Sequence, residues 1–163
     1  MNKNKYPPHV SVLPEDDANR QLVAGFLLDP YLSSHRINVL RVAGGWLKAL
    51  DRFKSSHIAE MKKNQNRYLV LLIDFDGREG RLDEAKAVVP DNLKERVFIL
   101  GAWSKPEDLR KDGLGSYETI GQALAKDCRE ETDTTWGHRL LRHNAGELDR
   151  LRKHVRPIIF QSI

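Results

Sequence analysis

The 163-residue chain contains a single cysteine, Cys128, and no long run of apolar residues. One cysteine excludes an intrachain disulfide, and no Cys/His pattern typical of a zinc site can be assembled around it. No stretch approaches the ~20 apolar residues that a membrane-spanning helix needs, so no membrane partner is expected. The polar, basic N-terminus lacks the apolar segment of a signal peptide, and we therefore expect a cytoplasmic protein.

The chain also lacks internal repeats, low-complexity segments and a long linker. We therefore expect one domain at residues 9–163, preceded by a flexible tail at residues 1–8. Hydrophobic residues make up 40% and charged residues 31% of the chain, as in ordinary globular proteins. The net charge of +4 permits nucleic-acid binding through a local patch but does not by itself indicate it.

Apolar periodicity divides the chain into alternating strands and helices. Strands are expected where short β-branched or continuous apolar runs occur, at residues 9–13, 37–42, 68–73, 97–100 and 157–160. Helices are expected where apolar residues recur at three and four, at residues 16–28, 46–61, 81–89, 104–113, 116–128 and 136–155. A capping box of Ser104, Lys105, Pro106 and Glu107 is expected to open the fourth of these helices.

This alternation predicts an α/β three-layer sandwich, with a mainly parallel sheet of about five strands and helices on both faces. Functional groups in such sheets gather at the carboxyl ends of the strands. Acidic residues at strand ends are therefore informative.

Two acidic clusters follow predicted strands. The first is Glu15 with Asp16 and Asp17, and the second is Asp74 with Asp76. If the two strands are neighbours, Glu15, Asp74 and Asp76 converge, and such carboxylates raise one another's pKa. Mg²⁺ or Mn²⁺ would resolve this repulsion, with Asp16 as an auxiliary ligand. In an extended chain both aspartates of the second cluster point to the same side.

A purely structural interpretation of these clusters stays open. Asp74 and Asp76 are also suited to a turn, because Asp and Gly favour turns. Glu15, Asp16 and Asp17 are suited to a helix N-terminus, where negative charge is stabilised by ~0.3–1 kcal/mol for each residue.

The acidic pattern resembles the Toprim domain of topoisomerases, primases and overcoming-lysogenization-defect nucleases, over about residues 9–102. In that family a Glu ends the first strand and an Asp-x-Asp ends a later strand, as Glu15 and Asp74-Phe75-Asp76 do here. The resemblance implies Mg²⁺-dependent cleavage of DNA or RNA, with Glu15 as general acid/base and the aspartates as metal ligands. It also implies an ATPase partner from a phage-defence system, and a homodimer is a further expectation. The Gly that often follows the family's Glu is Asp16 here.

The first half of the chain also resembles the receiver domain of response regulators. The stretch VLPEDDANRQLVAGFL resembles its opening, which makes Asp74 the phosphate acceptor and Ser104 the hydroxyl residue after the fourth strand. The Lys-Pro that follows the family's fifth strand is missing, because PIIFQSI contains no Lys. A receiver-like or degenerate α/β interaction module is therefore the non-enzymatic alternative.

Basic residues provide candidate phosphate contacts in two places. Arg78 and Arg81 follow the second acidic cluster, and Arg presents a planar fork to a phosphate. The last predicted helix carries Arg139, Arg142 and His143, and we expect its basic face to contact a phosphate backbone. A solvated loop and a solvated outer face are the structural alternatives for these two groups.

Overall fold

The computed structural model describes residues 7–160 and confirms the predicted α/β class. Within these residues, four parallel strands form one sheet in the order β2-β1-β3-β4. The predicted tail at residues 1–8 lies mostly outside the described residues. The strands are β1 (His9–Pro14), β2 (Ile37–Val39), β3 (Arg67–Leu72) and β4 (Val97–Leu100).

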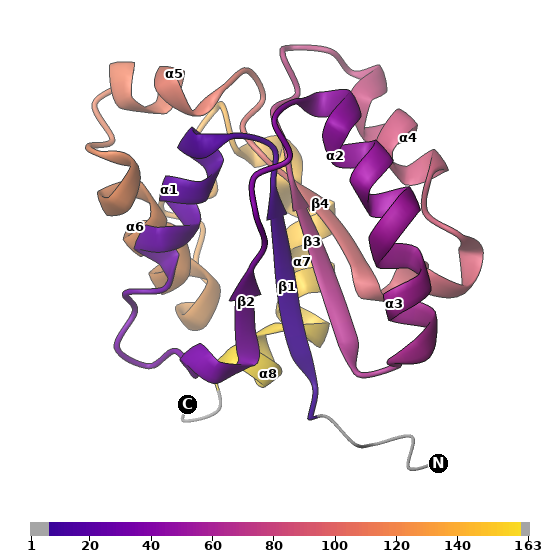
Figure 1. Ribbon diagram of the computed structural model, residues 1–163. Helices are drawn as coiled ribbons and strands as arrows, with labels where there is room; N and C mark the ends of the chain where they lie inside the picture. The colour runs from indigo at the N-terminus through magenta and orange to yellow at the C-terminus, as the bar shows by residue number, and fades with distance from the viewer. Residues whose placement is uncertain (1–6, 161–163) are drawn as a thin grey trace.

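Helices cover both faces of the sheet and complete a three-layer sandwich (Figure 1). On one face lie α1 (Asp17–Phe26), α5 (Pro106–Lys111), α6 (Tyr117–Glu130), α7 (Ala145–His154) and α8 (Arg156–Ile159). On the other lie α2 (Trp46–Arg52), η2 (Phe53–His57, a π-helical turn), α3 (Ile58–Lys63) and α4 (Gly80–Ala87). The 3₁₀ turns are η1 (Ser34–Arg36), η3 (Asp91–Arg96) and η4 (Arg142–Asn144).

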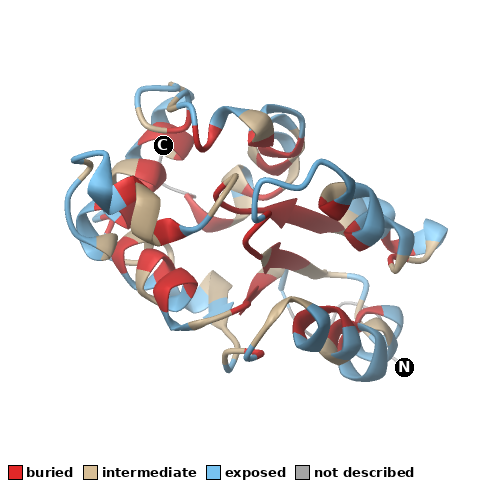
Figure 2. Ribbon diagram, turned by 90° about the horizontal axis from the view of Figure 1, so that it is seen from above, coloured by how far each residue is buried: buried red, intermediate tan, exposed pale blue. Residues whose placement is uncertain are grey.

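Two hydrophobic cores fill the spaces between these layers. Alternate residues of a strand enter opposite cores, so that Phe98 packs under α6 and α7 while Ile99 packs under α4. Viewed from above, the buried strands lie between helices whose outer sides are exposed (Figure 2). All four residues of β4 are buried, as the continuous apolar run of a parallel strand predicts.

The expected fifth strand at residues 157–160 is wrong, because this segment belongs to helix α8. Pro157 occupies the first turn of the helix, where a missing N–H costs nothing. Short apolar runs do not distinguish a strand from a helix by periodicity. The sheet therefore ends at β4.

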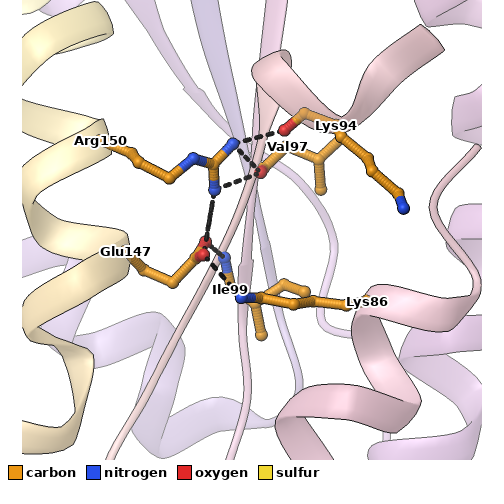
Figure 3. A network of polar contacts seen from close by, with 6 residues as sticks. All are labelled: Lys86, Lys94, Val97, Ile99, Glu147 and Arg150. Atoms are coloured by element: carbon orange, nitrogen blue, oxygen red, sulfur yellow. Dashed lines mark hydrogen bonds and ion pairs between the residues drawn. The ribbon is translucent and has the colours of Figure 1, made fainter. Parts of the chain in front are cut away.

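The open edge of β4 is covered by side chains of η4 and α7 instead of by another strand. Asn144 accepts a hydrogen bond from the N–H of Gly101 at 3.1 Å and donates to its carbonyl at 3.0 Å. Glu147 accepts from the N–H of Ile99 at 3.0 Å, and Arg150 donates to the carbonyl of Val97 (Figure 3). These polar side chains satisfy backbone groups that a fifth strand would otherwise pair.

Several predicted helix boundaries are wrong. The helix predicted at residues 136–155 is a series of turns until α7 begins at Ala145, because Asn144 turns its side chain to the sheet edge. The capping box also fails, because Lys105 is the N-cap of α5 and Ser104 Oγ has no hydrogen-bond partner among the described residues. The strand predicted at residues 37–42 is shortened to Ile37–Val39.

Candidate active site

The two acidic clusters meet at the carboxyl edge of the sheet. Strands β1 and β3 are direct neighbours, with Pro14 opposite Leu72 in the register. Glu15 follows the first strand, and its Oε2 accepts a 2.6 Å hydrogen bond from the backbone N–H of Asp74. The chain leaves β1 to form β2 on one side of it, and then crosses back to form β3 on the other side. The carboxyl edge between β1 and β3 is therefore the topological switch point, where open α/β sheets bind ligands.

Asp16 is the N-cap of α1 and orients the next polar residue of that helix. Its Oδ1 accepts a 3.0 Å hydrogen bond from the backbone N–H of Asn19. The side-chain amide of Asn19 donates both to Asp16 Oδ1 at 3.0 Å and to Asp74 Oδ1 at 2.9 Å. Because both partners are carboxylates, the amide orientation is fixed, and the buried Oδ1 of Asn19 has no donor within residues 7–160.

Arg81, from α4, holds the segment that follows Asp74. Its Nη1 donates to the carbonyl of Asp74 at 2.8 Å and lies 3.1 Å from Oδ2 of Asp76. The guanidinium carbon lies 4.6 Å from the ring centroid of Trp46, at the start of α2. Arg81 is therefore the cation that the structure brings to the acidic site.

The residues after β3 are not extended as predicted. Asp76 adopts a left-handed conformation with φ of 50°, and Gly77 follows with φ of 67°. Phe75 is buried, and its carbonyl accepts from the N–H of Arg78, which closes a turn. The turn separates the two aspartates, so that Asp74 is buried while the side chain of Asp76 is 53% exposed and paired with Arg81.

The pKa of Asp74 is raised to about 7, mainly by burial and to a smaller extent by the negative charges of Glu15, Asp16 and Glu107, while the hydrogen bond from Asn19 opposes this shift. Burial also raises the pKa of Glu15, although the hydrogen bond from Asp74 and the charge of Arg81 partly offset this effect. Glu15 and Asp74 thus form a buried acidic pair that no cation neutralises through an ion pair within residues 7–160. Such a pair favours binding of a proton or a metal cation.

An aromatic cluster packs against the turn that follows β3. The ring of Phe75 lies 6.5 Å from that of Trp103 and 5.0 Å from that of His143. The carbonyl of Trp103 accepts a 2.7 Å hydrogen bond from the N–H of Gly77. Burial lowers the pKa of His143, an effect that the Gly101 backbone partly offsets. His143 therefore lies beside the acidic site and not on the outer face of α7.

The predicted basic residues are dispersed. Arg78 is exposed next to Asp76, but Arg139 pairs with Asp112 at 2.7 Å, and Arg142 is exposed in η4. Since α7 begins only at Ala145, these arginines do not form the predicted face along one helix. Asn19 was not predicted as a site residue. It lies in a short polar stretch between Asp16 and the apolar residues of α1, and nothing in that stretch distinguishes it from its neighbours.

The donor atoms at this edge suit a hard cation. Glu15, Asp74 and Asn19 offer carboxylate and amide oxygens, which are ligands that Mg²⁺ prefers. Among the described residues there is no group of three or more His, Cys, Asp or Glu side chains placed to hold a metal ion. The residues therefore fit a cation bound by few protein ligands and completed by water or phosphate oxygens, as is usual for Mg²⁺.

No helix of the described chain is long and apolar enough to cross a membrane. No protein-family model matches the chain, and comparisons with curated proteins and with solved structures find no match either. A fold of this class hosts many activities, so the fold alone does not identify the function, and the chemistry of the site is the guide to it.

Proposed function

We propose that the carboxyl edge of the sheet is a divalent-cation site for phosphodiester cleavage in DNA or RNA. The observation that supports this proposal is the buried pair of Glu15 and Asp74: the Glu15 carboxylate accepts from the backbone N–H of Asp74, and neither side chain has an ion pair within residues 7–160. A buried carboxylate pair is costly unless a proton or a metal compensates it. The site also lies at the switch point of the sheet, where ligands of such folds bind.

In this proposal Asp74 and Glu15 hold Mg²⁺ or Mn²⁺ with the free Oδ1 of Asn19 as an auxiliary ligand, while Asp16 orients the Asn19 side chain. The bound cation would polarise the phosphate and stabilise the charge that develops on it. Glu15 moves a proton between water and the leaving group, because its raised pKa brings it closer to neutral pH.

Arg81 and Asp76 form the phosphate-facing part of the site in this proposal. Arg81 is held by Asp76 and by the carbonyl of Asp74, and its Nε has no partner among the described residues. This Nε is buried, so in the proposal Arg81 fixes the turn and contributes its positive charge to the site. Arg78, exposed on the same turn, supplies a second positive charge.

The finer parts of the proposal come from the Toprim resemblance. They are nuclease activity in a phage-defence system and coupling to an ATPase partner protein, and the sequence adds a homodimer and a cytoplasmic location as separate expectations. The chain is short, and a partner that selects the substrate would explain how so small a site acts on defined nucleic acids.

The test is cleavage of labelled DNA and RNA with Mg²⁺ or Mn²⁺ by the wild type and by the Asp74→Asn and Glu15→Gln variants. We expect cleavage only with metal and its loss in both variants, because each removes a charge from the cation site. Asp17→Asn is the matched control, because Asp17 lies beside the site but pairs with Arg20 on the exposed side of α1. Equal cleavage by wild type and Asp74→Asn would exclude this site as the active site.

A receiver-like signalling module is the second candidate, and the geometry of Asp76 favours it. The turn pairs Asp76 with Arg81, so that Asp74 has only Glu15 and Asp16 as neighbouring carboxylates in the acidic site. The buried hydroxyl of Ser104 has no hydrogen-bond partner within residues 7–160. Acetyl phosphate with Mg²⁺ should then modify Asp74, and Asp76→Asn should leave this modification intact. In the nuclease proposal Asp76→Asn should instead weaken phosphate binding, because Arg81 loses its ion pair and is held only by the Asp74 carbonyl and Trp46.

A further inference from the structure

Two segments of the chain carry a surplus of positive charge, residues 41–63 and residues 139–156. Residues 41–63 contain six Lys or Arg and only two Asp or Glu, a surplus of four. Residues 139–156 also contain six Lys or Arg and two Asp or Glu, but ion pairs engage Arg139, Arg150 and Arg152 of that segment. The basic residues of the first segment are Arg41, Lys48, Arg52, Lys54, Lys62 and Lys63.

The segment is mostly one continuous helical rod, formed by α2, η2 and α3, which runs from the carboxyl edge of the sheet to the opposite edge (Figure 1). At 1.5 Å per residue, the rod is roughly 27 Å long. Its inner side packs Leu50, Phe53 and Met61 into the core. Five cations are exposed on this segment, and we call them the α2–α3 basic face: Arg41, Lys48, Lys54, Lys62 and Lys63.

The cations of this face are largely unpaired. Within residues 7–160, only Lys54 of the face has an ion pair, with the exposed Asp51 at 3.6 Å. An exposed pair of this kind contributes little and leaves the local charge surplus in place. The arginines of α7 differ, because Arg150 pairs with Glu147 at 2.9 Å and Arg152 with Asp133 at 3.1 Å.

The face begins beside the acidic site. The side chain of Lys48 folds back over Gly44, where an added Cβ would lie 3.9 Å from Lys48 Nζ. The N–H of Gly44 in turn donates a 2.8 Å hydrogen bond to the carbonyl of Glu15. Trp46, half-buried at the start of α2, contacts the guanidinium of Arg81. A polyanion along the rod would therefore reach the carboxylates at its upper end.

We propose that the α2–α3 basic face binds the phosphate backbone of a nucleic-acid strand and leads it to the Glu15–Asp74 site. The destination of the strand rests on the proposed function, whereas the binding surface rests on the unpaired charge alone. Exposed cations spaced along one helical rod are suited to the phosphate backbone of single-stranded nucleic acid.

An anionic membrane is the less suitable partner for this face. Helices that bind in a membrane interface bury several large apolar side chains. Leu47 is the only large hydrophobic residue of this segment that is strongly exposed among the described residues, and the others, Leu28 and Tyr31, precede β2.

The test is fluorescence anisotropy with a labelled single-stranded oligonucleotide in EDTA, at a series of salt concentrations. The variant Lys48→Gln/Lys62→Gln/Lys63→Gln removes three charges from the face. The control Lys111→Gln/Lys126→Gln/Lys153→Gln removes three exposed lysines from α5, α6 and α7, on the other side of the sheet. We expect the first variant to lose about tenfold or more in affinity at low salt, with a salt slope lower by about 2 to 3. The control should stay close to wild type.

Three results would overturn the inference. Equal losses in both triple variants would mean that only net charge matters. Failure of the wild type to bind the oligonucleotide would also overturn it, and binding to vesicles containing phosphatidylserine in that case would identify a membrane partner. Unchanged KM for cleavage in the first variant would be the third. The Asp74→Asn variant separates the two proposals, because it should keep oligonucleotide binding while it loses cleavage. If the wild type binds the oligonucleotide but shows no metal-dependent cleavage, only the proposed function is contradicted.

Discussion

The backbone N–H of Asp74 donates a 2.6 Å hydrogen bond to the Oε2 of Glu15, across two neighbouring parallel strands. The contact brings together two carboxylates that are 59 residues apart in the sequence. It also fixes the Glu15 side chain next to a second buried acid.

Metal binding should stabilise the wild type in a pH-dependent way. A cation that binds only the folded state raises its stability, and protonation of Asp74, whose pKa is about 7, competes with the cation. We therefore expect Mn²⁺ or Mg²⁺ to raise the melting temperature more at pH 8 than at pH 6. Differential scanning fluorimetry measures this shift, and Asp74→Asn should abolish it while Asp17→Asn retains it.

The contribution of Asp74 to the stability of the metal-free protein should fall as pH rises from about 4 to about 7, whereas the lowered pKa values of His57 and His143 act in the opposite direction. The pKa of Asp74 is raised to about 7 from an unfolded value of 3.8, so in this window the folded state holds a proton that the unfolded state has released. Asp74→Asn removes this penalty and can still accept from Asn19. Urea denaturation should show a gain in stability for the variant at pH 8 that disappears at pH 4. A gain of equal size at both pH values would contradict the assigned titration.

Glu15→Gln should lower the pKa of Asp74. The glutamine keeps an oxygen for the N–H of Asp74 but removes one of the negative charges that raise the Asp74 pKa. Carboxyl NMR titration measures the shift directly. Asp17→Asn serves again as the control, and an unchanged Asp74 pKa in Glu15→Gln would mean that the Glu15 charge does not contribute to the shift.

Removing the cap on the sheet edge should destabilise the fold. Asn144→Ala leaves the buried N–H and carbonyl of Gly101 without their side-chain partner, at a cost of about 2–4 kcal/mol. Asp149→Ala, on the exposed side of α7, is the control and should change the free energy of unfolding little. Urea denaturation of both variants measures the difference, and equal stabilities would show that water replaces Asn144.

Two glycines of the helical layers should respond in opposite ways to alanine. A Cβ at Gly25 of α1 would lie 2.1 Å from the carbonyl oxygen of Glu118, so the close packing of α1 on α6 must open. A Cβ at Gly146 in α7 would meet nothing within 4 Å. We expect Gly25→Ala to cost about 2 kcal/mol or more and Gly146→Ala to stabilise by up to about 1 kcal/mol. Thermal denaturation of the two variants should therefore give shifts of opposite sign.

The parallel sheet and its functional edge follow from the sequence because continuous apolar strands alternate with amphipathic helices. Four expected strands overlap β1 to β4, and the two acidic clusters lie at the ends of two adjacent strands. The expected fifth strand at residues 157–160 is wrong for a physical reason. A short run of apolar residues fits either element, and only packing on α7 and β1 decides for helix α8.

The sequence by itself determined which side chains reach the carboxyl edge, because strand ends fix the positions of Glu15 and Asp74. Only the tertiary structure decided how these groups are paired. A left-handed turn places Asp76 where it forms an ion pair with Arg81. The side-chain amide of Asn19 donates hydrogen bonds to both Asp16 and Asp74, although Asp74 is distant in the chain. The packing also sets which cations are paired: Arg150 and Arg152 of α7 have ion pairs, whereas Lys48, Lys62 and Lys63 have none among the described residues. Such pairing depends on which elements pack together, and local sequence patterns do not encode it.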